Sequence, residues 1–127
     1  HFNSGSGIMI TGSHNPKSHN GFKFIADGIC FFGDNITKIS KTISNQDFIT
    51  DKGNYKSISI ETSYIKRILE DIDFKGNSLK IAWDLSNGAS CNIVKSLTKN
   101  LPGEHFFIND EIDGNFPGHD PDPTDHK

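Results

Sequence analysis

Apolar and polar residues in the first third of the chain follow the patterns of short strands joined by tight turns. The run Ile8–Thr11 is apolar and ends at Gly12, which is typical of a buried strand. Residues 22–26 alternate and then meet Asp27-Gly28, a dipeptide typical of hairpin turns. Residues 29–32 are expected to form a further short strand. The pattern therefore predicts a small sheet whose first two strands flank a polar loop.

Two helices are expected next, because apolar residues recur at spacings of three and four. The first would start near Asp34, and its apolar face would consist of Ile36, Ile39 and Ile43. The second would follow a polar stretch over residues 44–58, and its apolar face would consist of Ile65, Ile68, Leu69 and Ile72.

The second half of the chain predicts a strand, a helix and another strand. Residues 79–85 and 105–108 read as strands, and between them lies a helical stripe made of Ile93, Val94, Leu97 and Leu101. A βαβ unit of this kind normally pairs its strands in parallel through a right-handed crossover. The proline-rich and acidic residues 110–127 are expected to form an extended loop.

Neither half contains enough elements to cover both faces of its sheet. We therefore expect an α/β protein built as α/β/α layers around mixed sheets, present as parts of two domains. The break is placed at Lys75-Gly76-Asn77, which gives one part over residues 1–75 and a second over residues 76–127.

Composition narrows the classes of partner. The chain has 127 residues, a formal net charge of −3 and a single arginine, Arg67, which argues against a nucleic-acid surface. No apolar run approaches the roughly 20 residues that span a bilayer, so no membrane contact is expected and a cytoplasmic protein is predicted. Cys30 and Cys91 match no metal or redox spacing and are expected to be reduced, buried thiols.

The loop after the first strand carries the candidate chemistry. Ser13 follows Gly12, which permits a tight turn, and Pro16 fixes the exit of the loop. With His14 and Lys23 as nearby proton carriers or cations, the Ser13 hydroxyl could act as a nucleophile or carry a phosphoryl group. The alternative is a hydroxyl that only stabilises the turn.

Three motifs resemble one enzyme family. Residues 11–16, Thr-Gly-Ser-His-Asn-Pro, followed by Asn-Gly-Phe-Lys at 20–23, resemble the phosphoserine loop of the α-D-phosphohexomutases, in particular the bacterial phosphomannomutases/phosphoglucomutases. Residues 84–89 resemble the strand and turn that open the family's second domain. Residues 113–123 resemble its "DGNFPxHxPDP" segment. The resemblance implies the end of domain I and the start of domain II of a phosphohexomutase.

The resemblance also implies a mechanism. Ser13 would be the phosphoserine that gives its phosphoryl group to a hexose monophosphate, and a hexose bisphosphate would be the intermediate. His14 and Lys23 would be catalytic and substrate-binding residues beside the phosphoryl group. The family's metal is Mg²⁺, and in this chain its expected ligand is Ser13 through its phosphate.

The resemblance places further parts outside these residues. The metal-binding loop "DGDxDR", the sugar-specificity loop and the C-terminal phosphate-binding domain would lie beyond Lys127, and an active-site arginine before His1. One alternative is therefore an inactive fragment of a split or decayed mutase gene, and a companion chain could supply the missing domains. The motifs leave the preferred sugar phosphate open.

A second alternative, from a different class, is a metal-binding or interaction module. Residues 109–120 superficially match an EF-hand loop, and a histidine set could suggest zinc: His105, His119 and His126. Strand and proline signals on either side argue against EF-hand helices, and the histidine spacing fits no zinc pattern.

Overall fold

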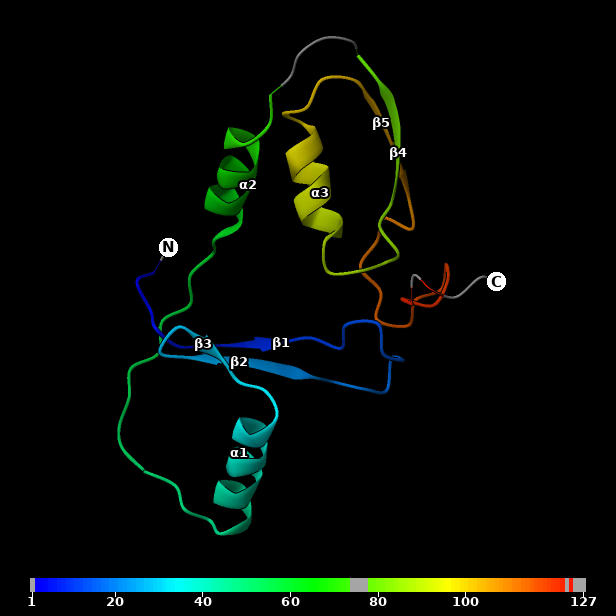
Figure 1. Cartoon of the computed structure of the whole chain (residues 1–127). Coiled ribbons are helices and arrows are strands. Elements are labelled where there is room, and N and C mark those ends of the chain that lie inside the picture. The colour runs from blue at the N-terminus through cyan, green and yellow to red at the C-terminus, as the bar shows by residue number, and fades with distance from the viewer. Residues whose placement is uncertain (1, 74–77, 123, 125–127) are drawn as a thin grey trace. The chain divides into compact units, whose positions relative to one another are not determined.

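The computed structural model describes residues 2–73, 78–122 and 124, and its elements form two compact units (Figure 1). The first unit comprises His1–Ser13 and Ser18–Lys56, and the second comprises His14–Lys17 and Ser57–Lys127. Each unit combines strands and helices, which confirms the predicted mixed α/β class. Among the residues described, none of the helices has the length and apolar character required to cross a membrane.

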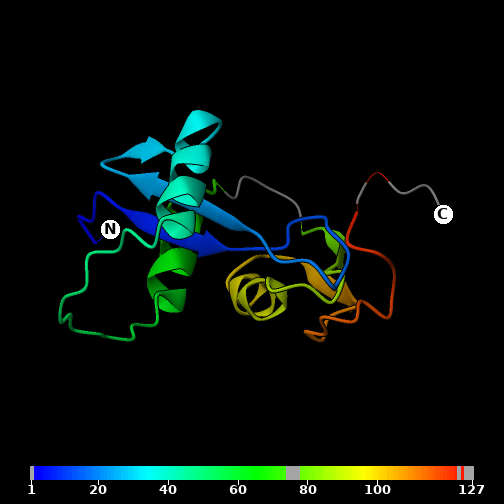
Figure 2. The same cartoon turned by 90° about the horizontal axis from the view of Figure 1, so that it is seen from below.

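The first unit is an antiparallel sheet followed by one helix. Its strands are ordered β1-β2-β3, with β1 at Gly7–Ile10, β2 at Phe22–Ala26 and β3 at Ile29–Cys30. The predicted Asp27-Gly28 turn joins β2 to β3, and both residues have positive φ, at 51° and 76°, as a two-residue hairpin of type I′ requires. Helix α1, at Asp34–Ser44, begins where the sequence predicted and lies on one side of the strands (Figure 2).

The apolar strand residues of this unit are exposed, contrary to the expectation of a buried first strand. All four residues of β1 are exposed, and Ile10 retains 70% of its accessible surface. Cys30 is also exposed, so only one of the two thiols is buried as predicted. The reason is physical: a sheet has two faces, and within this unit a single helix is the other regular element available to cover them.

The second unit contains the predicted βαβ arrangement. Strands β4, at Lys80–Asp84, and β5, at Glu104–Ile108, pair in parallel with Ile81 opposite His105, and α3 at Cys91–Thr98 connects them. Helix α2, at Glu61–Glu70, packs against α3. Helix α2 ends earlier than the apolar stripe suggested, so Ile72 lies beyond it.

One face of the β4–β5 sheet is packed and the other is open, so residues along each strand alternate between half-buried and exposed. Half-buried side chains on β4 and β5 alternate with the exposed Phe106 and Ile108, each of which retains 52% of its surface. The Trp83 indole N–H donates a hydrogen bond to Nδ1 of His105 over 3.1 Å. Cys91, at the start of α3, is fully buried. The core of the unit therefore lies between α3 and one face of the β4–β5 pair.

The two sheets are separate, as expected for parts of two domains. Helix α2 belongs to the second unit. Residues 74–77 lie outside the residues that the structure describes. The predicted break at residues 75–77 falls on those residues. The boundary between 1–75 and 76–127 therefore stays a prediction.

The accessible surface of the chain is unusually large for its mass. It amounts to 10788 Å² for 14.1 kDa. A compact monomer of that mass would expose about 6,700 Å², and two separate compact units of half the mass would together expose about 8,100 Å². The excess is consistent with sheets that each have an uncovered face.

Candidate functional site

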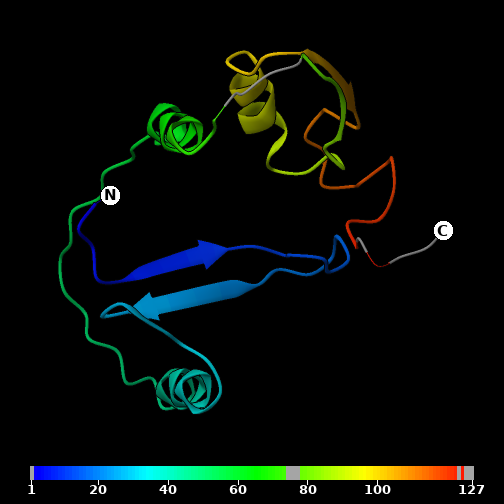
Figure 3. The ribbon, with the colours of Figure 1, turned by 45° about the horizontal axis from the view of Figure 1, so that its top comes forward.

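The loop between β1 and β2 is closed at its base by a backbone hydrogen bond. The ladder ends with Ile10 opposite Phe22, and the Thr11 N–H then donates to the Gly21 carbonyl over 2.9 Å. Figure 3 shows the two strands side by side with the loop extending from one end of the pair. The residues between Thr11 and Gly21, which we call the serine loop, therefore leave the sheet through a narrow neck.

Two glycines make this neck possible. A Cβ atom at Gly21 would lie 2.5 Å from the Thr11 carbonyl oxygen, closer than real Cβ atoms approach backbone. A Cβ atom at Gly12 would lie 3.2 Å from the His19 carbonyl oxygen. The close approach of the two backbone segments thus excludes a side chain at Gly21 and leaves little room for one at Gly12. It fixes where the serine loop begins and ends.

Ser13 is exposed at a turn just beyond the neck, and its backbone is left-handed with φ of 51°. Non-glycine residues adopt this region rarely, at a cost of about 1–3 kcal/mol that surrounding contacts must offset. One such contact is present, because the Ser13 N–H donates to Oγ1 of Thr11 over 3.0 Å.

The hydrogen bonds distinguish the two interpretations of the Ser13 hydroxyl, as a reactive group or as a group that only stabilises the turn. The hydroxyl that stabilises this turn is that of Thr11, a role that the sequence did not suggest. The Ser13 hydroxyl itself donates and accepts no hydrogen bond with any residue the structure describes. It is therefore accessible for chemistry with a ligand.

The structure places His14 and Lys23 on different elements. Lys23 is exposed on β2, opposite Met9, and belongs to the first unit with Ser13. His14 is exposed and belongs to the second unit, where its charge helps to lower the pKa of Asp122, after the larger effect of the Thr124 hydroxyl and N–H. Within the described residues, no hydrogen bond joins the side chains of Ser13, His14 and Lys23.

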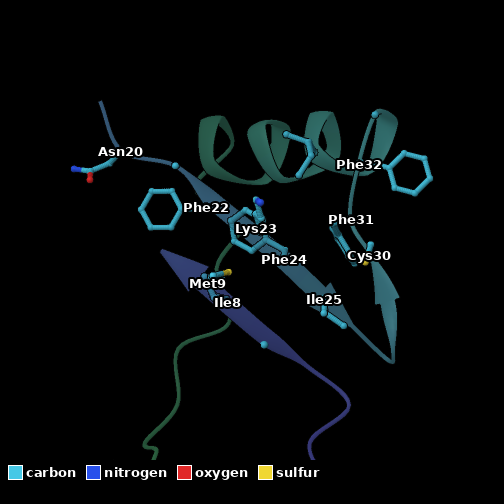
Figure 4. A pocket seen from close by; sticks show the side chains of 14 residues that line it. Ile8, Met9, Asn20, Phe22, Lys23, Phe24, Ile25, Cys30, Phe31 and Phe32 are labelled. Carbon is cyan, nitrogen blue, oxygen red and sulfur yellow. The ribbon is translucent and has the colours of Figure 1, made fainter. Parts of the chain in front are cut away.

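An open apolar groove of about 960 Å³ lies in the first unit (Figure 4). Its walls come from β1, β2, β3 and the start of α1, with Phe22 and Phe24 stacked at a centroid distance of 6.2 Å. Lys23 and Asn20 are the polar side chains among its lining residues. This groove is therefore too apolar to bind a sugar phosphate, which needs several hydrogen-bonding groups.

A polar cluster, which the sequence analysis did not find, lies at the carboxyl ends of β4 and β5. Asp84 accepts hydrogen bonds from the Asn109 side-chain amide and from the Ser86 N–H, both over 3.0 Å. Its other oxygen, Oδ2, lies 3.1 Å from Nε2 of His119. The hydrogen bonds, that from Asn109 foremost, hold the pKa of Asp84 below its usual value. Parallel strands bring their carboxyl ends to the same edge of a sheet. The positions of Asp84 and Asn109 at two such ends could therefore have indicated from the sequence that they lie close together.

Asn87 binds the acidic segment at residues 109–122 to the edge of the sheet where β4 and β5 end. Its side-chain amide donates to the Glu111 carbonyl over 2.8 Å, and its own carbonyl accepts from the Asp113 N–H over 3.0 Å. Its side-chain oxygen accepts from the Gly118 N–H over 3.4 Å. Residues 109–122 are therefore an ordered strap held at several points.

The metal-binding alternative gains no support from the described part of the chain. No three His, Cys, Asp or Glu side chains come together there as a metal site. His105 accepts from Trp83 and contacts the Leu101 carbonyl, and His119 is bound to Asp84. His126, the third histidine of the zinc alternative, lies outside the described residues.

Replacement of Gly21 by alanine should open the neck of the serine loop. The new Cβ atom would displace the Thr11 carbonyl and break the 2.9 Å hydrogen bond that closes the loop. We expect amide hydrogen exchange of residues 11–13 to rise about tenfold, as for the loss of a backbone hydrogen bond worth roughly 1 kcal/mol plus strain. Gly7→Ala is the matched control in β1, because its Cβ meets nothing within 4 Å. Equal exchange in both variants would contradict the close approach.

Comparison with protein-family models finds two matches, which together take up most of the chain. Residues 1–50 match the model described as phosphoglucomutase/phosphomannomutase, alpha/beta/alpha domain I. Residues 62–127 match the model of alpha/beta/alpha domain II of the same family. The two matches follow one another in the order expected from the sequence motifs.

Individual relatives agree with this match. The chain is 37% identical over 118 residues to a phosphomannomutase/phosphoglucomutase of Pseudomonas syringae pv. tomato, and the alignment covers 93% of this chain and 25% of the relative. It is 38% identical over 125 residues to a phosphoglucomutase of Neisseria meningitidis serogroup A, covering 97% and 27%. The chain thus spans about a quarter of the length of these relatives.

A solved structure extends the likeness to three dimensions. A phosphoglucomutase/phosphomannomutase family protein from Burkholderia thailandensis superposes with a TM-score of 0.86 at 39% sequence identity. The superposition covers 93% of this chain and 26% of that protein. Both the sequence and the fold of the chain therefore resemble the same portion of one family.

Proposed function

Because the chain belongs to the phosphoglucomutase/phosphomannomutase family, we propose that it supplies the phosphoryl-carrying serine loop of a phosphohexomutase. Ser13 is the phosphoryl carrier. In the proposed reaction, Oγ of phosphorylated Ser13 releases its phosphoryl group to a hydroxyl of a hexose monophosphate. The resulting hexose bisphosphate then returns its other phosphoryl group to the same oxygen, so the enzyme is regenerated and the phosphate of the sugar has changed position.

The observation that carries this proposal is the free Ser13 hydroxyl on a left-handed turn. Thr11 satisfies the turn, and the neck at Gly12 and Gly21 fixes the loop's base, so the hydroxyl is held outward without a partner of its own. A phosphoryl group on this oxygen carries a charge of about −1.5 to −2 at neutral pH and so requires cations. Lys23 and His14 are the proposed cationic groups, and they also bind the substrate's phosphate.

The family resemblance assigns Mg²⁺ to this reaction, where a hard cation would neutralise phosphate oxygens. The described residues do not by themselves form a site for it, because no cluster of three potential ligands is present among them. We therefore propose only that phosphorylated Ser13 contributes phosphate oxygen to the ion. We propose that the remaining ligands come from parts of the assembly outside residues 1–127.

Complete turnover is proposed for an assembly that contains the remaining three quarters of a relative's length, in one chain or from a companion chain. Hexose phosphates are the proposed substrates, and the names of the relatives differ in the sugar they specify. If the assembly never becomes phosphorylated, the alternative of a catalytically incompetent mutase fragment is the correct one.

The proposal is tested by mapping the phosphate. Residues 1–127 would replace the matched quarter of the Pseudomonas syringae relative, and the chimera would be incubated with a hexose 1,6-bisphosphate. We expect one phosphate per chimera, located by peptide mass spectrometry on Ser13. Ser13→Ala should remove it, whereas Ser18→Ala, an exposed serine of the same loop, should keep it. A phosphate that persists in Ser13→Ala would refute the assignment.

A further inference from the structure

His119 lies between two hydrogen-bond acceptors. Its Nε2 is 3.1 Å from Oδ2 of Asp84, and its Nδ1 is 2.8 Å from the backbone carbonyl oxygen of Asp120. Neither partner can donate a proton, since one is a carboxylate and the other a carbonyl. Both ring nitrogens must therefore carry hydrogen to satisfy both contacts, and only the imidazolium form does so.

The neutral ring cannot keep both contacts. If the proton leaves Nε2, a lone pair faces the Asp84 carboxylate. If it leaves Nδ1, a lone pair faces the Asp120 carbonyl at 2.8 Å. Ser86 is only a weak substitute, because its hydroxyl lies 3.3 Å from Nε2, longer than usual for a hydroxyl donor. The same nitrogen faces both Ser86 and Asp84, so the three residues do not form a catalytic relay, which needs the two groups on opposite ring nitrogens.

We propose that His119 is a pH-dependent latch that, as imidazolium, fastens the end of the strap at residues 119–122 to the carboxyl end of β4 and releases it on deprotonation. Asn87 holds the earlier part of the strap independently, through Asp113 and Gly118. The release is therefore confined to the residues beyond Gly118.

The surrounding charges favour this assignment. The hydrogen bond to the Asp120 carbonyl, and then that to Asp84, raise the pKa of His119 above its ordinary value of 6.5. From β4 the facing charge is Asp84, and from the strap it is Asp120, whose negative charge acts in the same direction. Asn109 at the end of β5 is neutral. Two other acids of the strap, Asp110 and Glu111, are paired with Lys95 of α3 at 2.8 and 3.3 Å.

The sign of the pH dependence follows from these shifts. The raised pKa of His119 means that its contribution to stability is complete below pH 6.5 and is lost as the pH rises through the folded-state value. The lowered pKa of Asp84 means that its contribution is present above pH 3.8 and is lost as the pH falls through the folded-state value. The latch is therefore closed between these limits, and it opens both above the folded-state pKa of His119 and below that of Asp84.

Nuclear magnetic resonance of the full ¹⁵N-labelled chain tests the latch. Imidazole ¹⁵N shifts would report the protonation of His119, and we expect its titration midpoint to fall in Asp84→Asn. Backbone order parameters at residues 119, 120 and 122 should fall from about 0.85 near pH 6 towards 0.6 above the midpoint. The Gly118 amide, held by Asn87, should stay rigid and serves as the internal control.

Two further variants keep the test decisive. In His119→Gln the order parameters of residues 119, 120 and 122 should no longer change with pH. His19→Gln, which removes an exposed histidine of the serine loop instead, should leave the change intact. The latch is overturned if His119 titrates identically in wild type and Asp84→Asn, or if the pH-dependent loosening persists in His119→Gln.

Discussion

Mutase turnover of the chimera should fall by about 10⁴-fold or more in Ser13→Ala, the scale on which the loss of a nucleophile acts. The substitution removes the only atom proposed to carry the phosphoryl group. The Thr11 hydroxyl is engaged by the Ser13 N–H at the base of the turn. The measurement is the rate of interconversion of hexose 1- and 6-phosphates with a hexose bisphosphate as activator.

Ser18→Ala is the matched control for turnover as well, because it removes a hydroxyl from the same exposed loop. We expect this variant to retain activity within about threefold, the usual range for surface changes of ±0.5 kcal/mol. Equal losses in both variants would mean that the loop tolerates no substitution and that Ser13 has no special role. Activity of Ser13→Ala near that of the wild type would locate the chemistry elsewhere.

The isolated chain of 127 residues should be a marginally stable monomer that associates as its concentration rises. Large apolar side chains remain exposed on both sheets, including Ile8 and Ile10 on β1 and Phe106 on β5. Contiguous apolar surface of this kind drives association or binding of hydrophobic dyes. We expect a concentration-dependent mass by sedimentation equilibrium, and a free energy of unfolding below about 5 kcal/mol for the dilute monomer.

A pair of matched substitutions locates the associating surface. Ile10→Thr removes an apolar side chain from β1, beside the exposed Phe22 of β2, and should weaken association. Ile49→Thr makes the same chemical change in an irregular stretch, where Ile49 is 99% exposed, and should weaken it much less. Cooperative unfolding of a dilute monomer with about 5 kcal/mol or more would contradict this prediction.

Local patterns predicted the elements well because their causes are local. The Asp27-Gly28 turn, the start of α1 at Asp34 and the parallel βαβ unit follow from backbone preferences and side-chain periodicity within a few residues. The burial of β1 was wrong for the opposite reason. An apolar run such as Ile8–Ile10 signals that a strand is suited to burial, but what covers it lies elsewhere in sequence.

The candidate site was only partly predictable. The Gly-Ser-His pattern singled out Ser13, yet the neck that positions it depends on Gly21, which approaches Thr11 across ten residues of sequence. The Asp84–His119 contact joins residues 35 apart, and no periodicity links them. Contacts between residues so far apart in sequence leave no local pattern. The polar residues at the carboxyl ends of the two parallel strands nevertheless indicate a shared site at that edge.

The Trp83–His105 hydrogen bond makes the two units optically distinguishable. The chain has one tryptophan, and it lies in β4 with its indole N–H tied to β5, so its fluorescence reports whether that strand pair is intact. The first unit contains no tryptophan and contributes only phenylalanines and Tyr55 to the near-ultraviolet signal. An unfolding curve followed by tryptophan emission therefore does not report directly on the β1–β3 sheet of the first unit. Separate midpoints by emission and by circular dichroism would reveal independent melting of the two units.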